Sequence, residues 1–322
     1  MPVPSETVHR SIVAQSPRSF FGALCPLTDM TRGESYEGED GGLYGGGKND
    51  PPASHLAAAI RHAASVQPLD ATGKPNEHGL IGLLAIGFSN TFHEFREFAG
   101  LTGPDPQVSS AVRPVNGAQL RVGLAAWVGT ESSGANPNFD PWQALDERLT
   151  QSGVAGPQIQ AAWIKLTPRV PAALGEFPVH VEEMTRDLRT VLRRLATRFP
   201  NLQLAFLSSR VFGGYAVTRL SPEPYAYESA FSVRRLIQEQ IRGDACLNCD
   251  SARGPVRSPL LLWGPYLWSR GEGGRQTDDL AWARDDFGAD GTHPSAAGAR
   301  KVAHQLLAFM KTDSAARPWF VA

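Results

Sequence analysis

The sequence predicts an α/β fold in which helices cover both faces of a parallel sheet. From Ile81 onward, short apolar segments alternate with longer amphipathic ones. This is the order expected of βαβ units joined by right-handed crossovers. The first of these segments, at residues 81–86, has four apolar residues in a row, as is typical of a strand buried on both faces.

Five segments are expected to form the strands, at residues 81–86, 108–115, 158–166, 202–208 and 259–263. Helical periodicity predicts helices at residues 54–67, 90–99, 122–128, 141–151, 179–198, 227–242 and 295–311. Three residues mark helix ends. Ser54 is expected to cap the first helix, Gly100 to close the second, and Pro200 to stop the long helix that ends at 198.

The N-terminal part of the chain follows neither pattern. Residues 1–55 are rich in Gly, Pro, Ser and Asp, and the run GGLYGGGKNDPP at 41–52 is incompatible with regular structure. Lys48 is followed by Asn-Asp-Pro-Pro and not by Ser or Thr opening a helix, which excludes a phosphate-binding P-loop. We expect residues 1–55 to be an irregular extension packed on one α/β domain formed by 56–322.

Composition narrows the class of partner. The 322 residues are 42% hydrophobic and 20% charged, with a formal net charge of −1. A chain of this size can bury a large core, and the balanced charge argues against nucleic acid or an anionic membrane as the main partner. No apolar run reaches the ~20 residues that span a bilayer, and the N-terminus lacks a signal-peptide core. The protein is expected either to stay inside the cell or to have lost a leader.

The three cysteines leave two alternatives open. Cys246 and Cys249 form a CxxC pair, but a zinc site would need two further ligands and the sequence has no second CxxC or HxxxH. Two free thiols or a local disulfide are favoured over a metal site. Cys25 is expected to be unpaired.

A serine stands where the first strand meets a helix. Gly87 and Phe88 form the turn, and Ser89 follows at the carboxyl edge of the sheet, where ligands bind in open α/β folds. The positive end of the helix dipole would face this position. Ser89 is therefore a candidate nucleophile, and the alternative is an ordinary helix-cap serine.

A second stretch favours the nucleophile. Asp290 lies three residues before His293 on a glycine-containing turn that precedes the last helix. An Asp at this spacing can accept from imidazole Nδ1–H and leave Nε2 free to take a proton from serine. The alternative is an Asp that caps a turn beside a surface histidine. Together, Ser89, His293 and Asp290 form a candidate catalytic triad.

The pairing of GFSN at 87–90 with DGTH at 290–293 resembles the SGNH (GDSL-type) hydrolase family. Phe88 replaces the Asp that is usual in the family. Longer stretches, including GGLYGGG, GFSNTFHEF, FPNLQLAFLSSR, LLWGPYLW and DGTHPSAAG, resemble a bacterial branch and extend over most of the chain. The resemblance implies a flavodoxin-like three-layer α/β/α sandwich and ester hydrolysis through an acyl-serine, without metal or organic cofactor.

The resemblance also implies an oxyanion hole. The family uses the N–H of the nucleophilic serine, a glycine after the second strand and an asparagine after the third. Here Leu120 and Arg121 stand at the glycine position, and Gly123 is a possible shifted substitute.

Lys165 stands where the family's asparagine is expected. It is expected either to donate to the oxyanion or to be a strand-end lysine that reaches solvent. Asn49 and Glu94 are expected to brace the nucleophile loop.

Two functions follow from this reading. The first is a serine esterase acting on a carboxylic ester; family analogy favours an acetyl or other short acyl group, linked to carbohydrate. The second is a non-catalytic binding protein on the same fold, in which Arg121 and Lys165 hold an anionic or carbohydrate ligand.

Overall fold

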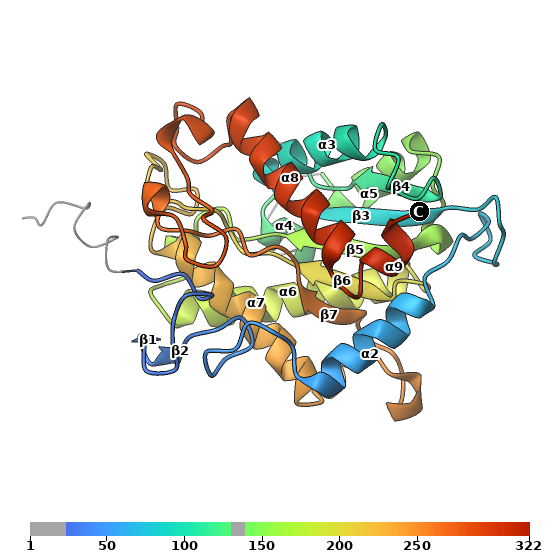
Figure 1. The fold of residues 1–322 in the computed structure, drawn as a ribbon, viewed down its shortest axis with the longest axis horizontal. Helices are drawn as coiled ribbons and strands as arrows, with labels where there is room; N and C mark the ends of the chain where they lie inside the picture. The colour runs from blue at the N-terminus through green and yellow to red at the C-terminus, as the bar shows by residue number, and fades with distance from the viewer. Residues whose placement is uncertain (1–23, 130–138) are drawn as a thin grey trace, which may run out of the picture.

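A computed structural model describes residues 24–129 and 139–322. It confirms the α/β class. One five-stranded parallel sheet has the order β4-β3-β5-β6-β7 (Figure 1). Its strands are β3 (Ile81–Gly87), β4 (Val112–Asn116), β5 (Ile159–Lys165), β6 (Leu204–Leu207) and β7 (Leu260–Trp263). The first of these strands therefore lies between the second and the third, which is the flavodoxin-like order.

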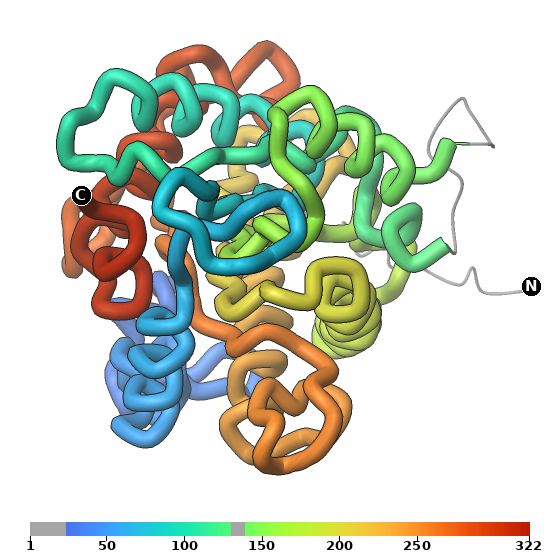
Figure 2. Tube along the Cα trace, turned by 90° about the vertical axis from the view of Figure 1, so that its right-hand side faces the viewer, coloured from blue at the N-terminus to red at the C-terminus, as the bar shows by residue number. Residues whose placement is uncertain are grey.

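Helices cover both faces of this sheet. They are α2 (Ala53–Ala64), α3 (Ser89–Thr102), α4 (Leu124–Val128), α5 (Pro141–Gln151), α6 (Val179–Arg198), α7 (Tyr225–Ile241), α8 (Ala296–Thr312) and α9 (Arg317–Phe320). Helix α3 packs on α8, and α6 packs on α7. Figure 2 shows α2 and α9 on one side of the sheet and α6 on the other. The arrangement is the three-layer sandwich that the resemblance implies.

Single-turn 3-10 helices occur in the connections. They are η1 (Gly156–Gln158), η2 (Pro171–Ala173), η3 (Ala245–Leu247), η4 (Ser251–Arg253), η5 (Gly271–Gly273) and η6 (Arg284–Asp286). Among the described helices, none combines the length and the apolarity needed to cross a bilayer.

Several predicted element ends are wrong, among them the end of the first helix, which lies at Ala64 and not at residue 67. Gly100 does not close α3, which continues to Thr102, because an exposed helical glycine costs only about 1 kcal/mol and Thr102 is buried. The N-cap of α2 is Pro52, not Ser54. The strand expected from residue 108 begins at Val112, since Val108 pairs with Val321 instead.

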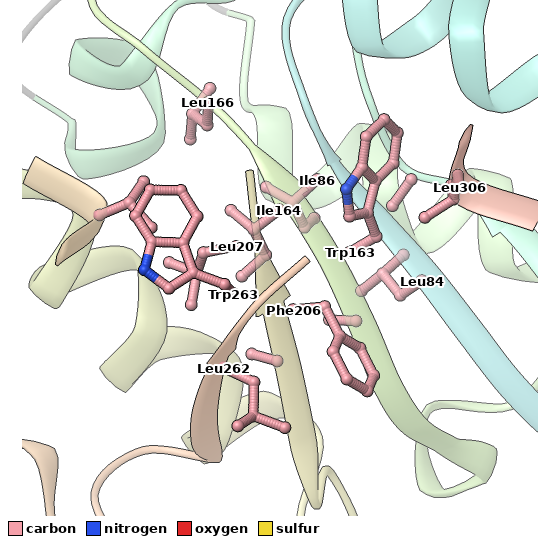
Figure 3. Close-up of a cluster of buried hydrophobic side chains, with 14 of the residues drawn as sticks. Leu84, Ile86, Trp163, Ile164, Leu166, Phe206, Leu207, Leu262, Trp263 and Leu306 are labelled. Atoms are coloured by element: carbon pink, nitrogen blue, oxygen red, sulfur yellow. The ribbon is translucent and has the colours of Figure 1, made fainter. Parts of the chain in front are cut away.

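The two central strands are buried because both faces of the sheet are covered. Every residue of β3 and β5 is buried. Figure 3 shows the cluster where β3, β5, β6 and β7 meet, with Trp163, Phe206 and Trp263 among its largest side chains. Trp163 is fully buried, and its indole N–H donates to Ser208 Oγ at 3.0 Å. This core holds the strand ends in place at the edge where Ser89 lies.

The described part of the N-terminal segment packs on α7 and β7. It contains a two-strand hairpin, β1 (Ser35–Tyr36) and β2 (Glu39–Asp40), while residues 41–52 form neither helix nor strand. Tyr36 Oη donates to Glu228 Oε1 at 2.5 Å, and Arg234 Nη2 donates to Glu39 Oε2 at 2.5 Å. These long-range contacts attach the segment to the α/β sandwich.

The cysteines are thiols. Cys25, Cys246 and Cys249 are all free, so the disulfide alternative for the CxxC pair is wrong. Within the described ranges, no group of three or more His, Cys, Asp or Glu side chains is arranged to hold a metal ion.

Candidate active site

The nucleophile candidate sits at a sharp strand-to-helix turn. Strand β3 ends at Gly87, and Ser89 is the first residue of α3. The turn needs glycine at position 87, because an added Cβ would lie 2.3 Å from the side chain of Thr91. Thr91 Oγ1 in turn donates to the carbonyl of Lys165 at 2.7 Å, which fastens the start of α3 to the end of β5.

Ser89, His293 and Asp290 lie in one hydrogen-bonded row. Ser89 Oγ is 2.8 Å from His293 Nε2, although the two residues are 204 positions apart. His293 Nδ1 is 2.5 Å from Asp290 Oδ2. With Nδ1–H donated to the carboxylate, Nε2 is the nitrogen that can accept the serine proton.

The Asp–His turn is held from several sides. Asp290 Oδ1 accepts the backbone N–H groups of Thr292 and His293, each at 3.0 Å. Asn90 Nδ2 donates to the carbonyl of Thr292 at 2.9 Å, and Val217 N–H donates to the carbonyl of Asp290 at 3.0 Å. The contact from Asn90, the neighbour of Ser89, was not predicted. Its position beside the nucleophile was the available signal.

These hydrogen bonds set the charge of Asp290. Partial burial acts to raise the pKa of its carboxyl, but the hydrogen bonds from His293 and from the two backbone N–H groups outweigh burial and lower it. Asp290 is therefore ionised at neutral pH and can both orient the imidazole and stabilise its protonated form.

The loop after β4 lies against the nucleophile turn. Gln119 N–H donates to the carbonyl of Gly87 at 3.1 Å. Gly123 is buried, and an added Cβ there would lie 2.5 Å from Arg169 Cγ. Arg121 is exposed with a φ of 66°. Backbone N–H groups of this loop and of the first turn of α3 are the candidate oxyanion donors, because the first N–H groups of a helix have no intrahelical acceptor.

Lys165 does not reach solvent, so the prediction of a solvent-exposed strand-end lysine is wrong. The residue is only 2% exposed, and its Nζ donates to both carboxylate oxygens of Glu94, at 2.6 and 2.5 Å. Burial lowers the pKa of the Lys165 ammonium, and Glu94 opposes that shift. To donate to an oxyanion, Nζ would have to leave Glu94. The pair joins α3 to β5.

Asn49 is placed elsewhere. Its Nδ2 donates to the carbonyl of Thr28 at 2.9 Å, and its Oδ1 accepts the N–H of Leu43 at 3.2 Å. Both ends of the side chain thus stabilise the N-terminal segment itself, as turn asparagines commonly do. The expectation that Asn49 braces the nucleophile loop is not met, and we leave it out of the site.

Two polar groups at neighbouring strand ends have no partner in the described chain. Arg210 follows β6 and is 4% exposed, and its Nε makes no hydrogen bond. Thr167 follows β5 and is 3% exposed, with an unpaired Oγ1. Burial lowers the pKa of the Arg210 guanidinium, while the nearby charges of Glu94, Glu223 and Asp290 oppose the shift. Both groups lie on the same sheet edge as Ser89.

No family model matches the chain, and no curated protein matches it. A candidate acylhydrolase from Bacteroides fragilis is 13% identical, covers 80% of this chain and 96% of its own, and has a TM-score of 0.37. An extracellular lipase from Streptomyces rimosus is 10% identical, covers 70% of this chain and 99% of its own, and has a TM-score of 0.30.

Proposed function

We propose that the protein is a serine esterase of the SGNH type that hydrolyses a carboxylic ester through an acyl-serine. One observation carries the proposal. Ser89 Oγ lies 2.8 Å from His293 Nε2, while the carboxylate of Asp290 accepts the Nδ1–H of the same imidazole. A serine, a base within hydrogen-bond reach and a third group that orients the base are the parts that nucleophilic acyl transfer needs.

The proposed reaction uses each member in turn. Ser89 Oγ attacks the ester carbonyl as His293 Nε2 takes its proton, giving a tetrahedral oxyanion. The C–O bond to the alcohol breaks, and His293 returns the proton to the departing oxygen. Water then attacks the acyl-serine with His293 as base, which releases the acid and restores Ser89. Asp290 stays ionised throughout and stabilises the imidazolium.

The oxyanion would be held by backbone donors. We assign this role to the N–H of Ser89, at the positive end of α3, and to the N–H of Gly123 in the loop that contacts the nucleophile turn. Arg121, exposed on that same loop, remains a candidate contact for the substrate. A short acyl ester, such as an acetyl group on carbohydrate, is the substrate class that we propose.

The test is burst release of p-nitrophenol from p-nitrophenyl acetate, together with labelling by a fluorophosphonate. The wild-type chain should label and turn over, and Ser89→Ala should lose both. Ser65→Ala is the matched control, because Ser65 is an exposed serine at the end of α2 whose Oγ bonds only its own helix. The control should behave as wild type.

Two outcomes would decide against the proposal. No labelling and no turnover on any short ester would favour a non-catalytic binding protein. Labelling of Ser89 with an unchanged rate in His293→Ala would leave the serine reactive but remove His293 as its base.

A further inference from the structure

A groove rich in arginine lies near the amino ends of β6 and β7. It encloses about 630 Å³. We call it the arginine groove, and its main lining residues are Arg193, Arg194, Arg198, Arg257, Trp142 and Val256. A second cavity of about 390 Å³ adjoins it, shares Arg193 and Arg257 and adds Arg253.

The groove is remote from the proposed active site. Arg198 is the last residue of α6, shortly before β6 begins, and Arg257 lies in the loop before β7. Both positions are therefore at the amino ends of strands, whereas Ser89 follows a carboxyl end. Figure 2 looks onto the face where α6 and the loop before β7 come together.

The charge of the groove is compensated only in part. Among the residues that the structure describes, neither cavity has an Asp or Glu in its lining. Arg194 donates to the carbonyls of Trp127 and Val128, and Arg198 pairs with Asp146.

The other three guanidinium groups of the two cavities make no contacts of this kind within the described chain. Over residues 24–129 and 139–322, those of Arg193, Arg253 and Arg257 take part in no ion pair or side-chain hydrogen bond. The last turn of α6 carries roughly half a negative charge from the helix dipole. The positive charge of three unpaired guanidinium groups is much larger than this negative charge at the end of the helix.

We propose that the arginine groove binds a small molecule that carries two or more phosphate groups. A guanidinium group can bind two oxygens of one phosphate through two parallel N–H donors. Several guanidinium groups on one wall therefore favour a compact polyanion over a single carboxylate. The volume is within the range of small-molecule sites. The ring of Trp142, half-buried beside Arg198, and the exposed Val256 give the uncharged part of the molecule an apolar wall.

Calorimetric titration with inorganic tripolyphosphate tests the groove directly. The full chain should bind it saturably and more weakly as salt is raised. Arg193→Gln with Arg257→Gln should weaken binding at least tenfold. Arg61→Gln with Arg113→Gln removes the same charge from exposed positions on α2 and β4 and should bind as wild type. Thermal melting of each variant confirms that it is folded.

A second arm identifies the source of the phosphates. Sedimentation with phosphatidylcholine vesicles, with and without a bisphosphorylated inositol lipid, separates a lipid headgroup from a soluble phosphorylated molecule. Binding in either arm that depends on Arg193 and Arg257 supports the proposal. Absence of saturable binding in both arms, or equal binding by the groove variant and the control, overturns it. Ester hydrolysis is not part of either readout, so the result is independent of Ser89.

Discussion

At the scale of single residues, two buried charges join the helix that carries the candidate nucleophile to the sheet. The side chains of Lys165 and Glu94 are each 1% exposed, and they contact each other through two hydrogen bonds. Removing each ion from water costs several kcal/mol, and their mutual attraction offsets that cost only while both are present. The pair therefore adds little net stability but makes the placement of α3 on β5 specific.

Lys165→Met should lower the free energy of unfolding by about 3–5 kcal/mol, because it leaves the Glu94 carboxylate buried without a partner. The double variant Lys165→Met with Glu94→Leu should recover most of that loss. Urea denaturation of the wild type, both single variants and the double variant measures the coupling. A cost below about 1 kcal/mol for Lys165→Met would show that Glu94 finds another partner.

The folded double variant also separates structure from catalysis. If Lys165 only braces α3, kcat on p-nitrophenyl acetate should stay within about tenfold of wild type. A fall in kcat of roughly 10²-fold or more would indicate that Lys165 donates to the oxyanion, since that is the usual cost of removing one oxyanion donor.

Asp290→Asn should reduce kcat by roughly 10²–10⁴-fold with little change in KM, because the amide cannot stabilise the imidazolium or hold its tautomer. The pKa of Asp290 is lowered in the folded state. Its stabilising effect is therefore present above the ordinary Asp pKa and is lost as pH falls through the folded value. Steady-state kinetics test the first statement, and urea denaturation of both proteins down an acid series tests the second. An unchanged kcat would remove Asp290 from the mechanism.

At the scale of elements, the proposed site exists because separate loops meet at one sheet edge. The turn that carries Asp290 and His293 is bonded to α3 through Asn90 and to the loop after β6 through Val217. Gly291 lies at the closest approach, with a φ of 65°. An added Cβ would stand 1.7 Å from the carbonyl oxygen of Tyr215. The hydrogen-bonded arrangement of Ser89, His293 and Asp290 thus depends on Gly291, which has no side chain.

Gly291→Ala should lower stability by about 2 kcal/mol or more and reduce kcat at least tenfold, because both the positive φ and the backbone contact exclude a side chain. Gly33→Ala is the matched control, since an added Cβ there meets nothing within 4 Å and φ is not positive. Thermal melting and esterase assays of the two variants make the comparison. Equal behaviour of both would mean that the turn accommodates the methyl group.

At the scale of the whole molecule, one buried carboxyl connects three segments around the core. Glu223 accepts the N–H of Gly213 at 2.7 Å, the N–H of Tyr227 at 3.0 Å and the indole N–H of Trp268 at 2.7 Å. These donors belong to the loop after β6, to α7 and to the segment after β7. Burial raises the pKa of Glu223 to about 7, although the three hydrogen bonds oppose the shift.

The raised pKa predicts a pH dependence of stability. Between the unfolded pKa near 4.5 and the folded value of about 7, the folded state binds more protons than the unfolded state. The contribution of Glu223 to stability therefore falls as pH rises through this window, by an amount on the order of 3 kcal/mol, and is constant above it. Glu223→Gln should lack this slope. The unfolding free energies of the two proteins are measured at intervals from about pH 5 to about pH 8. The difference between them should change with pH. A constant difference would contradict the prediction.

Much of the fold was predictable from local patterns, and the site was predictable in part. The continuous apolar run of β3 predicted a strand buried on both faces, and the long amphipathic period predicted α6 with its observed bounds. The spacing of Asp290 and His293 predicted their contact. Lys165 and Asn49 were harder, because a single polar residue next to a strand or in a glycine-rich loop carries no signal of what it will meet.

By itself, the sequence determined the alternation of strands and helices, the turn at Gly87 and the reach of Asp290 to His293, because each depends on residues close together in the chain. Only the tertiary structure decided the remaining features. It paired the Lys165 ammonium with Glu94, bonded Asn49 to the N-terminal segment, and gathered arginines from α6 and the loop before β7 into one groove. The physical reason is that a charge or a proton acceptor finds its partner through packing across the sheet, which no local pattern encodes.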